Sequence, residues 1–202
     1  MKPIRVILAV EDLLSESVAR ALLAQTGKAF SVTQALQLRN NVYLRDKTPA
    51  LNRTAKGFPV VLITDLDRPS DCSPALIKRW LKGELQHPNL LFRVAVMEIE
   101  SWVMAHRDVC ADFLGVPISR IPLNTDRIEK PKEFLLALAR KSRSSRLKNE
   151  LLPSDGATSK VGPGYNSLLG SFVRERWCAR EACEASPSLK RAFDRFVNFD
   201  MA

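Results

Sequence analysis

Val60–Asp67 has the sequence VVLITDLD, a run of aliphatic residues that ends in two aspartates separated by one leucine. A run of β-branched and aliphatic residues of this length predicts a strand that is buried on both faces of a parallel sheet. Two further apolar runs also end in acid: Ile7–Asp12 has the sequence ILAVED, and Arg93–Glu100 has the sequence RVAVMEIE. Three such strands predict an α/β fold, in which ligands bind outside the carboxyl ends of the strands.

The first half of the chain alternates between strand patterns and helix patterns. We expect strands at Ile4–Val10, Phe30–Leu38, Val60–Thr64 and Leu91–Met97, and helices at Ser15–Gln25, Ser73–Lys82 and Ile99–Leu114. Residues 39–58 are polar and basic and include Pro49 and Gly57, so we expect a long connection there, with or without a short helix. The alternation predicts a mostly parallel, Rossmann-like sheet with helices on both faces.

From about Gly115 onward the sequence contains no strand-like run. Three amphipathic segments predict helices instead: Pro131–Arg146, Asn166–Trp177 and Ser188–Phe199. Residues 152–165 are rich in Gly, Pro, Ser and Asp and predict a loop. We therefore expect an α/β domain at residues 1–114 and a helical extension at residues 115–202 that packs on it. The three tryptophans are expected in the core rather than as platforms for nucleic-acid bases: Trp80, Trp102 and Trp177.

The composition indicates a basic protein. Its 202 residues carry a formal net charge of +9, which favours a polyanionic partner such as nucleic acid, although charge alone is weak evidence. Five of the cations lie in one short run and are either nucleic-acid contacts or a solvated helix end: Arg140, Lys141, Arg143, Arg146 and Lys148. No apolar run is long enough to cross a membrane. The four cysteines include no CxxC pair, which favours reduced thiols in a cytoplasmic protein.

The acids that follow the strands form the candidate site. They are Glu11, Asp65, Asp67, Glu98 and Glu100. A single Asp after a strand is more often a cap or turn residue than a ligand, but Asp65 and Asp67 would point the same way in an extended chain, and Glu98 and Glu100 repeat that spacing. Carboxylates gathered at one edge would repel one another unless a cation lay among them. Oxygen ligands of this kind suit Mg²⁺ or Mn²⁺.

The order of these acids resembles a known domain. A Glu after the first strand, followed by a hydrophobic strand that ends in DxD, resembles the Toprim domain of topoisomerases, primases and related nucleases. The segment Met97–Trp102, MEIESW, is similar to the segment that supplies another acidic ligand in OLD-type Toprim nucleases. Lys160–Asn166, KVGPGYN, and Ser188–Ala192, SLKRA, resemble the tail of an uncharacterised family of small stand-alone Toprim-like bacterial proteins that are often associated with phage defence.

The resemblance implies roles for the acids. It implies Glu11 as the first-strand acid, Asp65 and Asp67 as metal ligands, and Glu100, with Glu98 beside it, as a further ligand. The chain departs from the Toprim pattern directly after Glu11, where Asp12-Leu13-Leu14 stands in place of a glycine or small residue. The chain contains no ATP-binding P-loop, so it lacks the ATPase half of the larger OLD proteins and would need a companion ATPase if it acts as they do.

The chemistry predicted for this site is Mg²⁺- or Mn²⁺-dependent hydrolysis of phosphodiesters in nucleic acid, with DNA the more expected substrate. Glu11 is the candidate general base. Lys160 is either a cation that stabilises charge on the phosphate or an ordinary surface lysine. Gly162-Pro163-Gly164 would either offer backbone N–H groups to an anion or form a plain turn.

Two alternatives belong to other functional classes. The segments Ile7–Asp12 and Asp65–Pro69 also resemble a response-regulator receiver, in which acids gather around Mg²⁺ and an Asp accepts phosphate. A receiver requires a Lys after a later strand, where this chain has Glu98 and Glu100. The other alternative is a non-catalytic subunit that keeps the fold and binds nucleic acid or a partner protein without cutting.

Overall fold

The computed structural model describes residues 3–38, 41–68 and 71–202. Its centre is a four-stranded sheet in which every strand pairing is parallel and the strand order is β2-β1-β3-β4. The strands are β1 (Ile4–Val10), β2 (Phe30–Gln37), β3 (Val60–Asp65) and β4 (Leu90–Ala95). The α/β fold with a parallel sheet is thus confirmed.

The central strands are buried on both faces because their apolar runs are continuous. Along β3, Val61 and Ile63 pack into the larger of two hydrophobic clusters, whereas Val60 and Leu62 pack into the smaller one. All four side chains are at most 1% exposed. Successive residues of a strand point to opposite faces, so one uninterrupted run of Val, Leu and Ile supplies the core on both sides of the sheet.

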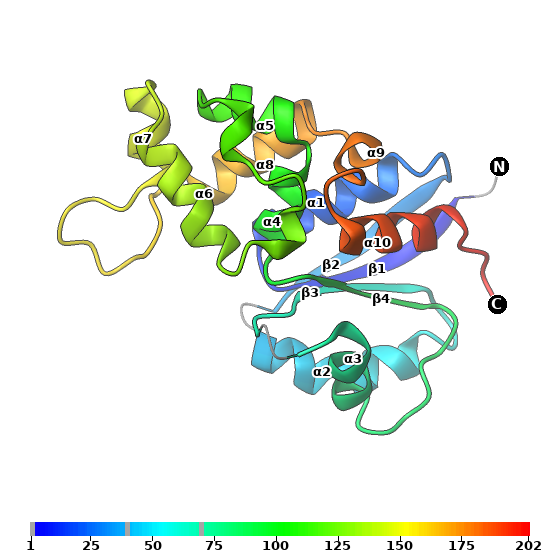
Figure 1. Ribbon diagram of the computed structural model, residues 1–202. Coiled ribbons are helices and arrows are strands. Elements are labelled where there is room, and N and C mark those ends of the chain that lie inside the picture. The colour runs from blue at the N-terminus through cyan, green and yellow to red at the C-terminus, as the bar shows by residue number, and fades with distance from the viewer. Residues whose placement is uncertain (1–2, 39–40, 69–70) are drawn as a thin grey trace.

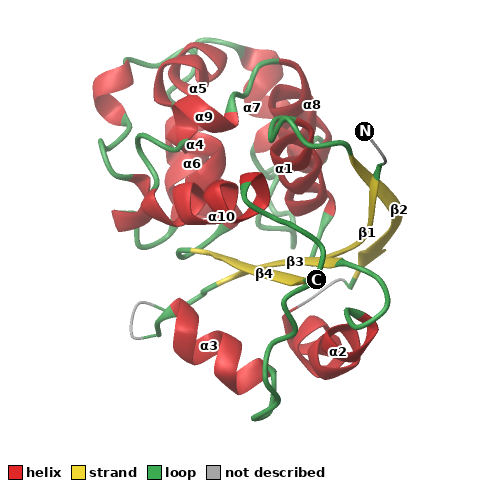
Figure 2. Cartoon of the chain, turned by 90° about the vertical axis from the view of Figure 1, so that its right-hand side faces the viewer, coloured by secondary structure: helices red, strands yellow, loops and turns green. Residues whose placement is uncertain are grey.

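Helices cover the two faces unequally (Figures 1 and 2). The smaller cluster lies under α2 (Asn41–Thr54) and α3 (Ser73–Trp80). The opposite face carries the remaining helices: α1 (Leu13–Ala24), α4 (Ile99–Ala105), α5 (Arg107–Leu114), α6 (Pro131–Arg140), α7 (Ser145–Leu151), α8 (Tyr165–Glu175), α9 (Ala179–Ala182) and α10 (Pro187–Val197). Two short 3₁₀ turns lie at Ile118–Arg120 and Thr125–Arg127.

Residues 41–54 correct one sequence-based expectation. This segment, expected to be a long connection with at most a short helix, forms the 14-residue helix α2, while residues 39–40 lie outside the described part of the chain. The buried face of α2 includes Leu44, Thr48, Leu51 and Asn52, which follow helical spacing. Two of these four residues are polar, so the segment lacks an obvious apolar stripe. Both polar side chains form hydrogen bonds inside the protein: the Thr48 hydroxyl donates to the Leu44 carbonyl at 2.9 Å, and the Asn52 amide donates to the Leu85 carbonyl at 2.9 Å.

The predicted C-terminal extension is helical and packs on the sheet domain. Its residues belong to the same hydrophobic cluster as β1, α1 and α4, so the two parts of the chain share one core. Trp80, Trp102 and Trp177 are each at most 4% exposed, which confirms their expected place in the core. The predicted helix at residues 131–146 is divided in two, because α6 ends at Arg140 and α7 begins at Ser145. None of the described helices is long and apolar enough to cross a membrane.

Candidate functional site

The carboxyl ends of β1, β3 and β4 are neighbours because β3 lies between the other two strands. Glu11 follows β1, Asp65 is the last residue of β3, and Glu100 lies in the first turn of the helix after β4. Each of Glu11 and Glu100 contributes to the electrostatic environment of Asp65. The structure therefore brings together acids from three strand ends, as the sequence predicted. We call this cluster the acidic edge.

Glu11 is held against the end of β3. Its Oε1 accepts a hydrogen bond from the Thr64 hydroxyl at 2.6 Å and a longer one from the Asp65 backbone N–H at 3.5 Å. Burial raises the pKa of Glu11 above its ordinary value of 4.5, the Thr64 hydrogen bond opposes this, and the negative charge of Asp67 adds to it. The chain then turns directly into α1, where Asp12 acts as N-cap and accepts from the Ser15 N–H at 2.8 Å.

Asp65 lies at the centre of the acidic edge. Burial, and next the negative charges of Glu100 and Glu11, raise the pKa of this carboxyl well above its ordinary value of 3.8. In the described part of the chain, Asp65 forms no salt bridge that would offset these charges. The acidic edge therefore favours a proton on Asp65, or a bound cation in its place.

Asp67 takes a different position from the one its spacing predicted. The strand ends at Asp65, and Asp67 adopts a left-handed backbone with φ of 62°, so the two aspartates do not follow one another on an extended strand. The Asp67 N–H donates to the Met97 carbonyl at 3.1 Å, and its exposed carboxylate accepts a hydrogen bond from the Asn41 amide. Asp67 is near enough to Glu11 to raise its pKa, so it lies at the rim of the acidic edge.

Glu98 and Glu100 also differ from the predicted geometry. Helix α4 begins at Ile99, so Glu98 precedes the helix and Glu100 lies within its first turn. The Glu98 carboxylate accepts from the backbone N–H of Lys132 at 2.7 Å, at the start of α6. Glu100 is 1% exposed, and its Oε2 is buried without a hydrogen-bond partner among the described residues. An unpaired buried carboxylate oxygen is costly unless a proton or cation satisfies it.

Two residues of the site were not predicted from the sequence. The Tyr165 hydroxyl donates to Glu100 Oε1 at 2.7 Å, and Lys132 Nζ lies 3.4 Å from the same oxygen. Burial lowers the pKa of Lys132, but the negative charges of Glu100, Glu98 and Asp65 outweigh it and raise that pKa to about 12. Burial, and next the charge of Glu100, raise the pKa of Tyr165, so its hydroxyl stays a donor. Tyr165 stands in the KVGPGYN segment, whereas nothing in the sequence distinguished Lys132 from a surface lysine.

The Gly162-Pro163-Gly164 segment positions Tyr165. The Gly162 N–H donates to the Leu151 carbonyl at 2.8 Å and the Gly164 N–H to the Glu150 carbonyl at 3.0 Å. A Cβ on Gly162 would overlap the Glu150 carbonyl oxygen and would lie 2.6 Å from that of Leu152, so only glycine allows this approach to the end of α7. Of the two interpretations, the plain turn is correct, because both N–H groups are used within the protein. Lys160 is exposed in the preceding loop, and among the described residues no contact joins it to the acidic edge.

The donor chemistry at the acidic edge fits a divalent cation, although no finished ligand set is formed. Within residues 3–38, 41–68 and 71–202, no group of three or more His, Cys, Asp or Glu side chains is arranged to hold a metal ion. The features that fit are the free oxygen of Glu100 and the repulsion that raises the pKa of Asp65. Asp65 and Glu100 are the residues that would hold the ion, with Glu11 beside Asp65. Carboxylate oxygens are the ligands that Mg²⁺ and Mn²⁺ prefer.

The predicted basic run lies at the far end of α6 from Lys132. In the part of the chain that the structure describes, none of its members has a side-chain hydrogen bond or ion pair, and all but the half-buried Lys148 are exposed: Arg140, Lys141, Arg143, Arg146 and Lys148. Arg140 comes eight residues after Lys132 on α6, so the run begins about 12 Å from Lys132 along the helix axis. The run is available to a polyanion but does not touch the acidic edge.

Comparisons with models of protein families, with curated proteins and with solved structures found no match to this chain. The resemblance to Toprim proteins therefore stays a prediction.

Proposed function

We propose that this chain is a Mg²⁺- or Mn²⁺-dependent nuclease of the Toprim type, which hydrolyses phosphodiesters in nucleic acid. One observation carries the proposal: three strand ends deliver Glu11, Asp65 and Glu100 to one edge, where burial and like charge leave them without enough positive charge. A structural acid cluster would gain stability by pairing with Arg or Lys. Here Lys132 is the one cation joined to it among the described residues.

The surroundings of each residue at the acidic edge favour a different role in the proposed reaction. Thr64 holds Glu11 through Oε1, which leaves Oε2 to accept a proton from water, and the raised pKa of Glu11 makes its carboxylate a stronger base. Asp65 and Glu100 would hold the ion, and the bound ion would supply positive charge to the scissile phosphate. Lys132 and Tyr165 fix the orientation of Glu100.

The nucleic acid would be held by cations outside the acidic edge. The net charge is +9, and the run from Arg140 to Lys148 offers five cations that have no acidic partners among the described residues. The loop that contains Lys160 extends from the same side of the molecule as the carboxyl ends of the strands (Figure 1), which leaves Lys160 as a candidate phosphate contact. DNA, a role in phage defence and a companion ATPase are parts of this proposal that rest on the resemblance alone.

The test is cleavage of plasmid, single-stranded DNA and RNA in Mn²⁺, with the wild type, Asp65→Asn and Asp46→Asn. Asp46 is exposed and pairs with its neighbour Arg45, so its variant controls for the loss of one carboxylate. We expect cleavage in the wild type and Asp46→Asn but not in Asp65→Asn. Equal cleavage by Asp65→Asn would reject the proposal, and metal binding without cleavage by any of the proteins would favour the non-catalytic alternative.

The receiver alternative gains one observation from the structure, since Lys132 brings a lysine to the acids from α6. That lysine contacts Glu100 rather than Asp65. Labelling with acetyl phosphate separates the two functions: a receiver would form an aspartyl phosphate that Asp65→Asn abolishes, whereas the nuclease would not be labelled.

A further inference from the structure

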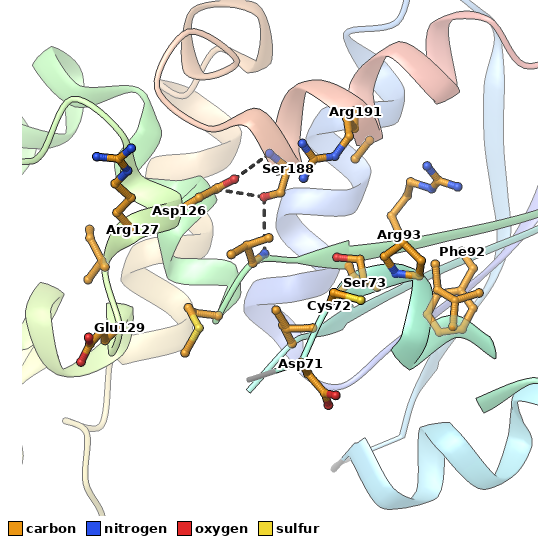
Figure 3. A pocket seen from close by; sticks show the side chains of 18 residues that line it. Asp71, Cys72, Ser73, Phe92, Arg93, Asp126, Arg127, Glu129, Ser188 and Arg191 are labelled. Atoms are coloured by element: carbon orange, nitrogen blue, oxygen red, sulfur yellow. Dashed lines mark hydrogen bonds between the residues drawn. The ribbon is translucent and has the colours of Figure 1, made fainter. Parts of the chain in front are cut away.

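A cavity of about 710 Å³ lies along the outer edge of β4, between α3 and α10 (Figure 3). In the strand order β4 is an edge strand, so one side of it faces the cavity instead of another strand. The lining includes Leu66 and Met97, which adjoin acids of the acidic edge in the sequence, and also Arg93 and Arg191. The cavity thus adjoins segments that carry acids of the candidate site.

Arg93 is the unusual residue of this cavity. It lies on the face of β4 whose neighbouring residues, Leu91 and Ala95, are completely buried in the core. Its Nε is buried without a hydrogen-bond partner among the described residues, and no described acid forms a salt bridge with it. Burial, and next the positive charges of Arg195 and Arg191, lower the pKa of Arg93 to about 10. Arg93 as a whole is half-buried, and a guanidinium with a buried, unpaired nitrogen is normally paired with an anion.

The neighbouring charges do not supply that anion. Arg191 and Arg195, both on α10, add positive charge, and Arg195 is itself held by the Pro88 carbonyl at 2.9 Å. Two of the acids that line the cavity already have partners, and the third lies far from Arg93. Asp71 pairs with Arg79 at 2.6 Å, Asp126 accepts from the Ser188 N–H at 2.7 Å, and Glu129 lies at the opposite end from Arg93 in Figure 3.

We infer that this cavity, which we call the arginine pocket, binds the phosphates of a single-stranded nucleic acid that runs from the acidic edge along β4; the inference rests on the proposed function. Arg93 lies two residues before the last residue of β4, Ala95, which corresponds to about 7 Å along the strand. Arg93 and Arg191 would therefore hold a phosphate that flanks the cleaved one.

The walls of the pocket favour a single strand over a duplex. Between its two ends the lining is largely apolar, with Pro74 and Ile77 from α3 and Val96 after β4. Unstacked bases can lie on arginine guanidinium planes and between apolar side chains, while the bases of a duplex are stacked inside the helix. A volume of about 710 Å³ is also in the range of pockets for small ligands, and is too small to enclose a duplex.

The test is binding of a fluorescein-labelled twelve-residue oligothymidylate, followed by anisotropy in EDTA, so that no metal-dependent cleavage occurs. The variants are Arg93→Gln, Arg191→Gln and, as the control for charge, Arg53→Gln. Arg53 lies on α2 on the other face of the sheet, where it pairs with Glu84 at 2.6 Å. Arg191 is exposed, so Arg191→Gln keeps the test valid if Arg93→Gln does not fold.

We expect Arg93→Gln and Arg191→Gln each to weaken binding of the single strand about 10-fold and to reduce its dependence on salt, while Arg53→Gln changes it less than about 2-fold. A duplex of the same length should bind more weakly and respond equally to all three variants. Affinities that match the control would overturn the inference, as would thymidine monophosphate competing as well as the oligonucleotide, which would indicate a nucleotide pocket. Because binding is measured in EDTA, failure of the nuclease proposal would appear separately, as absent cleavage in Mn²⁺.

Discussion

The acidic edge and the arginine pocket lie on the same sheet and carry opposite imbalances of charge. At the acidic edge, Glu11, Asp65 and Glu100 are gathered with a single joined cation in the described structure, Lys132. In the arginine pocket, the half-buried guanidinium of Arg93 has other arginines for neighbours, and its buried Nε has no partner among the described residues. Neither imbalance stabilises the fold. Together they support the proposal that the ligand carries phosphate and that Asp65 and Glu100 would hold a divalent cation.

The largest expected effect concerns Glu100. Glu100→Gln keeps the size of the side chain but removes one charge from the acidic edge, so we expect metal-dependent cleavage to fall about 100-fold. The free energy of unfolding in EDTA should not fall, because repulsion of Asp65 is relieved. Initial rates of plasmid nicking measure the first effect and urea unfolding the second. Glu133→Gln, an exposed control on α6, should change neither, and a rate equal to that of the control would remove Glu100 from the site.

The second prediction concerns the cation joined to the acidic edge. Lys132→Met leaves the buried Glu100 with Tyr165 alone, so we expect the free energy of unfolding to fall by about 1–3 kcal/mol. Lys130→Met is the matched control, because Lys130 pairs with the exposed Glu133 and should contribute less than about 0.5 kcal/mol. Chemical denaturation of the two variants would contradict this prediction if they lost equal stability.

The third prediction is the pH dependence of stability in EDTA. Burial and like charge raise the pKa of Asp65 above 3.8, so the folded state binds a proton that the unfolded chain has released. The contribution of Asp65 is fully present below that ordinary pKa and is lost as the pH rises through the folded-state value. Asp65→Asn should therefore gain stability relative to the wild type as the pH rises, by about 1.4 kcal/mol for each pH unit that separates the two pKa values. A difference between the two proteins that does not vary with pH would contradict this.

The fourth prediction is the counterpart at the arginine pocket. Arg93→Met removes an unpaired, half-buried charge and keeps an apolar side chain against α10, so we expect the free energy of unfolding to rise by about 1 kcal/mol. Thermal unfolding at low salt measures it, with Arg53→Met as the control for the loss of a positive charge. If Arg93→Met is less stable than the wild type, Arg93 stabilises the fold. The statement that both regions carry a destabilising imbalance of charge would then be wrong.

The smallest effect is expected at the basic run. Arg143→Gln removes one exposed cation that has no partner in the described structure, so binding of nucleic acid should weaken about 2- to 3-fold. The slope of log affinity against log salt should fall by about 0.7 to 0.9. Because the run lies outside both the acidic edge and the arginine pocket, single strands and duplexes should be affected alike. A loss confined to single strands would instead extend the arginine pocket to α7.

The sequence predicted the parts of this molecule that depend on local pattern. Continuous aliphatic runs identified the buried parallel strands, and the acid after each run identified the acidic edge. The local geometry of the acids was wrong, because alternate residues share a face only in extended chain, and the chain leaves that conformation after Asp65 and enters α4 at Ile99. Helix α2 was not recognised because Thr48 and Asn52 occupy two of its buried positions.

The remaining features depend on packing between distant segments. Lys132 and Tyr165 reach Glu100 from α6 and α8, and no spacing within either segment indicates this contact. Arg93 interrupts the apolar run of β4. A cation on the buried face of a strand was the feature of the sequence that could have indicated the arginine pocket. The role of Arg93 could not be predicted without the position of α10, whose first arginine, Arg191, comes nearly a hundred residues later in the sequence.

The measurement that bears most directly on the acidic edge is calorimetric titration of Mn²⁺ into the wild type, Asp65→Asn and Asp46→Asn near neutral pH. We expect the wild type and Asp46→Asn to bind Mn²⁺ with equal affinity and Asp65→Asn to lose this binding. Binding by Asp65→Asn that equals the wild type, or no binding by any of the three proteins, would contradict the claim that the acidic edge is completed by a divalent cation.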